Sequence, residues 1–124
     1  MGFFDSFLNN KSVDWPGSAL ETMEQLDVLL ASSYRVPQLI FKHSTRCGIS
    51  SMVIKRFEAL FLQEHQKLKV YYLDLLNYRD ISDEVGYTFQ VRHQSPQLIV
   101  AKNGISIHHA SHYDITQTNL SRFI

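Results

Sequence analysis

The chain has 124 residues, 44% of them hydrophobic and 19% charged, and its 12 basic and 12 acidic residues give a formal net charge of zero. We expect one domain over residues 1–124, in which residues 1–17 form an aromatic lead-in. The even charge balance argues against a nucleic-acid binder, which needs a basic surplus. The single cysteine excludes an internal disulfide and disfavours a disulfide-stapled secreted scaffold.

Membrane and secreted proteins are also disfavoured. No apolar run approaches the roughly 20 residues of a membrane span. The first residues lack a basic region followed by an apolar stretch and a small-residue cleavage site, so a secretory signal is not expected. We therefore expect a cytoplasmic protein that contacts no membrane.

The first predicted helix opens at Ser18, with Glu21 three residues later in the capping-box pattern, and ends near Ser33. The short apolar run Gln38–Lys42 follows a proline and is typical of a buried strand. Apolar residues at the spacing of one helical face then predict a helix over Cys47–Glu64: Ile49, Met52, Val53, Phe57, Leu60 and Phe61.

The segment Lys69–Leu75 is rich in β-favouring residues and predicts a second strand. Because a long helix connects it to Gln38–Lys42, the two strands should be parallel neighbours. A further helix is expected over Asn77–Gln90, capped by Asp80 and shortened or broken by Gly86.

The last third of the chain predicts a hairpin and a closing helix. Ser95-Pro96 precedes the apolar strand Gln97–Ala101, and the next turn signal, Asn103-Gly104, predicts a two-residue hairpin. Ile105–Ala110 is the returning strand, and Asp114 is expected to cap a final helix. This order of elements predicts a mixed sheet with helices on both faces.

Cys47 falls where the predicted central helix begins. The first turn of a helix presents unpaired N–H groups and a partial positive charge, which favour an anion. A helix N-terminus lowers the pKa of a thiol from about 8.5 toward roughly 3.5–7.5, and the nearby Arg46, Lys42 and His43 act in the same direction. The alternative is a small buried filler, which is the usual role of a lone cysteine.

Three features coincide at positions typical of thioredoxin-like proteins. Cys47 opens the helix after the first core strand, Ser95-Pro96 precedes the third, and the Asn-Gly turn follows it. The chain therefore resembles a thioredoxin-like domain, an α/β fold in which helices flank a central mixed four-stranded sheet with room for a short fifth strand. The resemblance implies a cis peptide bond before Pro96, which would face Cys47, and a backbone edge at Ser95 for a substrate chain.

The stretch Phe41–Ser51 resembles the YtxJ-like family of monothiol bacilliredoxins, as do Tyr72–Asp74 and His93–Gln97. The resemblance implies thiol–disulfide exchange with bacillithiol as co-substrate, no tightly bound cofactor, and bacillithiolated proteins as partners. We expect a monomer. It implies that Cys47 is catalytic. It also implies substrate contacts from a set of flanking residues: Thr45, Arg46, Gly48, Ser50, Ser95 and Pro96. Commoner family members have proline where this chain has Gly48 and lack the charge of Arg46.

Ser50 stands where dithiol oxidoreductases have a second cysteine. Cys47 must therefore take the small thiol onto itself, and an external thiol must release it. Ser50 Oγ either donates a hydrogen bond to the thiolate or belongs to a plain first-turn helix residue. Bacillithiol carries carboxylates, which the guanidinium of Arg46 suits best, whereas Lys42 is expected to be a solvated surface charge.

Two other functions stay open. The tetrapeptide that begins at Cys47 is similar to the Cys-Gly-Phe-Ser motif of monothiol glutaredoxins, which implies [2Fe–2S] cluster binding through the cysteine. A thioredoxin-fold adaptor with an unreactive cysteine is the non-enzymatic alternative. Three histidines near the last strand do not predict a metal site, because adjacent strand residues point to opposite faces: His108, His109 and His112.

Overall fold

A computed structural model of the chain describes residues 17–44, 48–64 and 68–123. The elements in chain order are β1 (Ser18–Ala19), α2 (Met23–Ser32), β2 (Gln38–His43), α3 (Gly48–Glu64), β3 (Lys69–Asp74), α4 (Arg79–Phe89), β4 (Gln97–Lys102), β5 (Ile105–Ser111) and two 3-10 helices, η1 (His112–Gln117) and η2 (Leu120–Phe123). The strands form one sheet in the order β1-β3-β2-β4-β5. β1, β3 and β2 are parallel, whereas β4 and β5 are antiparallel additions.

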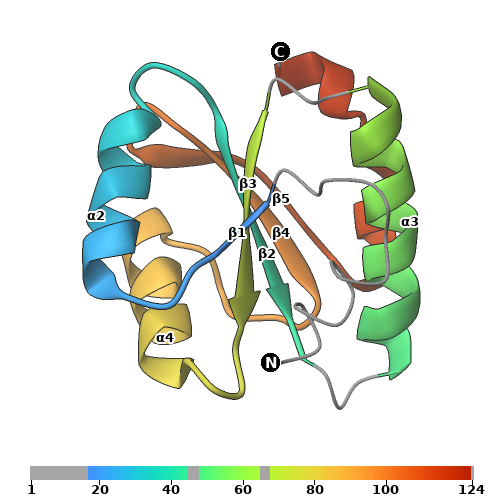
Figure 1. Cartoon of the computed structure of the whole chain (residues 1–124), viewed down its shortest axis with the longest axis horizontal. Coiled ribbons are helices and arrows are strands. Elements are labelled where there is room, and N and C mark those ends of the chain that lie inside the picture. The colour runs from blue at the N-terminus through green and yellow to red at the C-terminus, as the bar shows by residue number, and fades with distance from the viewer. Residues whose placement is uncertain (1–16, 45–47, 65–67, 124) are drawn as a thin grey trace.

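Helices cover both faces of this sheet (Figure 1). α2 and α4 lie against one face, and α3 lies against the other together with η1 and η2. The predicted βαβ unit is confirmed, since β2 and β3 pair in parallel across α3. None of the helices in the described ranges combines the length and the apolar character that a membrane span needs.

The central strand β2 is buried along its whole length. Side chains alternate along a strand, so Leu39 and Phe41 join the core under α3 while Ile40 joins the core under α2 and α4. The ring of Phe41 lies 5.0 Å from that of Phe57 in α3, centroid to centroid. A strand covered on both faces reads as a continuous apolar run, which is why it can be predicted from the sequence.

The first helix does not open at Ser18. Ser18 and Ala19 form β1 and pair with Tyr71 and Tyr72 of β3, so they supply the short fifth strand. The helix starts at Met23 after a second capping pattern, in which Thr22 Oγ1 accepts the Gln25 N–H at 3.1 Å and Gln25 Oε1 accepts the Thr22 N–H at 3.0 Å. The sequence has two capping patterns in succession, which begin at Ser18 and at Thr22. The first does not start a helix, because Ser18 pairs with β3 in the sheet.

Asp80 does not cap α4. The N-cap residue is Tyr78, which makes no side-chain cap, and Asp80 lies in the first turn, where its negative charge suits the helix dipole. Gly86 does not break the helix, which runs on to Phe89 and ends with Gln90 in the left-handed conformation at a φ of 57°.

The closing segment is not one helix capped by Asp114. It forms the two 3-10 helices η1 and η2, separated at Thr118, which has an extended backbone. This break lets three apolar side chains reach the core under α3: Ile115, Leu120 and Phe123. Packing against α3 therefore overrides the helical pattern of the sequence.

The predicted hairpin is confirmed. Asn103 and Gly104 connect β4 to β5 with φ values of 55° and 79°. A two-residue turn of type I′ requires a positive φ at both positions, and Asn-Gly meets that need. A Cβ atom at Gly104 would also collide with the hydroxyl of Tyr34.

Candidate functional site

The ends of β2 and β3, the first turns of α3 and α4 and the start of β4 all lie at one end of the sheet, the lower edge of Figure 1. Lys42 near the end of β2 pairs with Gln97 at the start of β4. This register places the end of β2 beside Pro96, in the crevice region where open α/β sheets bind ligands. Three predicted site residues lie outside the described residues: Thr45, Arg46 and Cys47.

Gly48 and Ser50 both lie in the first turn of α3. Gly48 is exposed, and a Cβ built on it would meet no atom within 4 Å. Ser50 is fully buried, and its Oγ accepts the backbone N–H of Ser44 at 3.4 Å. Ser50 thus ties the start of α3 to the residue that follows β2, whereas donation of its proton to a thiolate stays a prediction.

Ser95 and Pro96 precede β4 at the same end of the sheet. The Ser95–Pro96 peptide bond is cis. Pro96 is buried, and its carbonyl oxygen accepts the backbone N–H of His112 at 2.9 Å. Ser95 Oγ is buried and finds no hydrogen-bond partner among the described residues. The segment is therefore held by its backbone, while the role of Ser95 in substrate binding stays a prediction.

Lys42 is not the solvated surface charge expected from the sequence. Its exposed fraction is 0%, and its Nζ donates a hydrogen bond of 3.0 Å to the carbonyl oxygen of Ser82 in α4. Burial lowers the pKa of Lys42 to about 8, and the Asp83 carboxylate opposes this shift. Strand alternation predicts only that Lys42 and His43 point apart, and the packing of α4 on the sheet decides that Lys42 is covered.

Two of the histidines lie on different strands, His43 on β2 and His108 on β5. His43 is buried at the end of β2, where burial lowers its pKa and the Asp74 carboxylate opposes the change. His108 is half-buried, with its ring 5.4 Å from that of Phe123. Among the described residues no three His, Cys, Asp or Glu side chains are grouped so that they could hold a metal ion.

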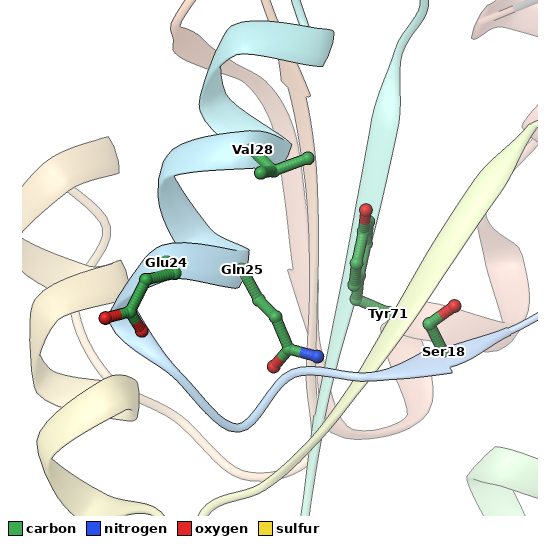
Figure 2. A pocket seen from close by; sticks show the side chains of 5 residues that line it. All are labelled: Ser18, Glu24, Gln25, Val28 and Tyr71. Atoms are coloured by element: carbon green, nitrogen blue, oxygen red, sulfur yellow. The ribbon is translucent and has the colours of Figure 1, made fainter.

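A pocket of about 300 Å³ lies between α2 and the β1–β3 edge of the sheet. In Figure 2, Gln25 and Val28 reach from α2 toward Tyr71, and Ser18 lies on β1. Gln25 is already engaged in capping, because its Oε1 accepts the backbone N–H groups of Glu21 and Thr22. We assign no chemistry to this pocket.

The model of the monothiol bacilliredoxin BrxC family matches residues 18–120, which is most of the chain. The chain belongs to this family. The match runs from β1 to the start of η2, so the strands, the helices α2, α3 and α4 and the site residues all fall within it. Membership agrees with the lone cysteine, and it makes the chain a thiol oxidoreductase.

Solved structures show the thioredoxin fold for this bacilliredoxin family member. A protein with a thioredoxin fold that is provisionally described as an oxidoreductase is similar at 25% identity and a TM-score of 0.74, over 86% of this chain and 92% of that one. Reduced thioredoxin pre-protein of Schistosoma mansoni matches at 16% identity and a TM-score of 0.71, over 89% and 100% of the two chains. Thioredoxin NaTrxh of Nicotiana alata matches at 15% identity and a TM-score of 0.71, over 92% of this chain and 97% of that one.

This family member also has a polar pocket that is not predicted from its sequence. The α4 pocket, of about 140 Å³, lies between the first turn of α4 and the segment before Pro96, and five residues line it: Leu75, Arg79, Ser82, Asp83 and His93. Burial and the charge of Lys42 lower the pKa of His93, while Asp83 opposes the shift. The i, i+3, i+4 spacing of Arg79, Ser82 and Asp83 on one helix face is the signal that could have found it.

Proposed function

We propose that the chain removes bacillithiol from mixed disulfides on proteins, with Cys47 as the nucleophile. It would act as a cytoplasmic monomer without a tightly bound cofactor, with bacillithiol as co-substrate. The family match and the thioredoxin fold support thiol chemistry in general, and the monothiol route is argued from the residues at the start of α3.

Ser50 is the observation that carries this proposal. It occupies the position of a resolving cysteine, and its Oγ is buried and bonded to the Ser44 N–H. The sequence contains no other cysteine besides Cys47. An internal disulfide therefore cannot form, and the small thiol has to remain on Cys47 until another thiol arrives.

The exchange then proceeds in two steps. The Cys47 thiolate attacks the bacillithiol sulfur of a protein mixed disulfide, and the old S–S bond breaks as the new one forms. The substrate protein leaves as a thiolate and takes a proton from solvent. An external low-molecular-weight thiolate next attacks the bacillithiol sulfur, which restores the Cys47 thiolate and yields a small-molecule disulfide. The external thiol is thereby oxidised to the disulfide level and the substrate thiol is reduced, while the bacillithiol sulfur stays at the disulfide level throughout.

The identity of the small thiol is tested by intact mass spectrometry of the chain after incubation with bacillithiol disulfide or with glutathione disulfide, at equal concentrations. We expect bacillithiol to add faster, and the adduct to map to Cys47. Equal or faster addition of glutathione would contradict bacillithiol as the co-substrate. The absence of any adduct would instead favour an adaptor with an unreactive thiol.

A further inference from the structure

We propose that the α4 pocket binds a carboxylate of the small thiol while its sulfur is exchanged at Cys47. The pocket is the one lined by Leu75, Arg79, Ser82, Asp83 and His93. This inference rests on the proposed function, because it concerns the co-substrate of the same exchange.

The α4 pocket lies at the end of the sheet where exchange would take place. Leu75 directly follows β3, and its backbone N–H donates to the carbonyl oxygen of His43 at the end of β2, at 3.2 Å. His93 precedes Pro96 by three residues, and the Gln97 amide fixes this segment by donating to the Arg92 carbonyl at 2.8 Å. The starts of α3 and α4 share this end of the molecule (Figure 1). The pocket and the start of α3 therefore lie at the same end of the sheet, on its two opposite faces.

Ser82 gives the pocket an unused polar group. Its side chain is 3% exposed, and its Oγ has no hydrogen-bond partner among the described residues. Its backbone is already engaged, since the N–H donates to Tyr78 and the carbonyl oxygen accepts from Lys42. A buried hydroxyl without a partner is unfavourable, and an acceptor atom placed in the pocket would relieve that cost.

The charges around the pocket favour an anion. Arg79 lines it in the first turn of α4, where the helix dipole adds a partial positive charge. Lys42 is buried directly behind it, bonded to Ser82. The carboxylate of Asp83 offsets one of these two positive charges and can accept hydrogen bonds from hydroxyl or ammonium groups of the same ligand. The guanidinium of Arg79 can hold a carboxylate through two parallel hydrogen bonds.

The volume of the pocket suits a small group and not a protein segment. A cavity of roughly 150 Å³ accommodates a molecule of the size of benzene, and the α4 pocket measures about 140 Å³. One carboxylate on a short carbon stem fits such a space. The protein half of the mixed disulfide would therefore lie elsewhere, which is consistent with the backbone edge at Ser95.

The test compares two disulfides on the full-length chain: bacillithiol disulfide, which carries carboxylates, and bis(2-hydroxyethyl) disulfide, which carries none. The rate of adduct formation at Cys47 is followed by intact mass. Arg79→Gln is expected to slow the reaction with bacillithiol disulfide about tenfold, and Ser82→Ala, which changes no charge, about threefold. Neither substitution should change the rate with bis(2-hydroxyethyl) disulfide.

Arg35→Gln serves as the matched control, because Arg35 is exposed in the turn before β2, at the opposite end of that strand from Lys42. It should react with both disulfides at the wild-type rate. If both pocket variants keep the wild-type rate with bacillithiol disulfide, or if they slow both disulfides equally, the pocket does not bind the carboxylate. A wild-type chain that forms no adduct with bacillithiol disulfide would instead overturn the proposed function itself.

Discussion

Cys47→Ser is expected to abolish release of bacillithiol from a bacillithiolated protein. A serine hydroxyl is not ionised near neutral pH and cannot form the mixed disulfide. The chain has no second cysteine that could substitute, so the rate should fall to that measured without the chain. The measurement is the loss of the bacillithiolated form of the substrate protein over time, followed by intact mass with an external thiol present.

Ser51→Ala is the control for this experiment, since it changes a nearby α3 residue by a single atom and leaves Cys47 in place. It should retain the wild-type rate. Release of bacillithiol by folded Cys47→Ser protein above the background rate would show that another group performs the exchange.

Lys42→Met is expected to stabilise the chain at about pH 7 by roughly 2 kcal/mol. Lowering the pKa of Lys42 from 10.5 to about 8 means that its charged form costs about 3 kcal/mol in the folded state. Methionine removes that cost and fills a similar volume, while loss of the hydrogen bond to Ser82 offsets about 1 kcal/mol. Urea unfolding of the two proteins measures the difference.

The pH dependence gives the same effect an independent readout. The pKa of Lys42 is lower in the folded chain than in the unfolded chain, so the unfolded chain binds more protons between about pH 8 and pH 10.5. The contribution of Lys42 to stability therefore rises across this window, and the advantage of Lys42→Met should shrink. Lys102→Met, at an exposed position of β4, should show neither effect. A destabilised Lys42→Met protein at neutral pH would mean that the buried charge is compensated.

A buried lysine with this cost is more easily understood as part of a site than as part of the core. Lys42 faces the core under α2 and α4, where an apolar side chain would pack without a desolvation penalty. Natural sequences accept such a loss of stability where function needs the group. The proposed α4 pocket is such a function, because the charge of Lys42 lies behind Ser82 and raises the positive potential of the pocket.

The sheet could be predicted from the sequence because its signals are local. The apolar run in β2 and the Asn103-Gly104 turn each point to one structure, and α3 between β2 and β3 fixes their parallel pairing. The starts and ends of helices were harder to predict. The capping pattern at Ser18 is as good as the one at Thr22, and only pairing of β1 with β3 decides between them.

Part of the candidate site could also be predicted from the sequence, and part could not. Cys47 and Ser50 can be recognised in the sequence because they have the spacing of the two cysteines of a dithiol oxidoreductase. Ser95-Pro96 can be recognised from its place before a strand. The burial of Lys42 depends on α4 packing over β2, and nothing near Lys42 in the sequence shows it. The α4 pocket likewise joins Arg79 and Ser82 to His93, residues that only the folded chain brings together.

The measurement that tests the monothiol mechanism most directly is a single turnover with a bacillithiolated protein, stopped before any external thiol is added. The intact masses of both proteins are then compared. The mechanism predicts that the substrate loses one bacillithiol and that the chain gains it on Cys47. A substrate protein disulfide-linked to Cys47, or a substrate that keeps its bacillithiol, would contradict it.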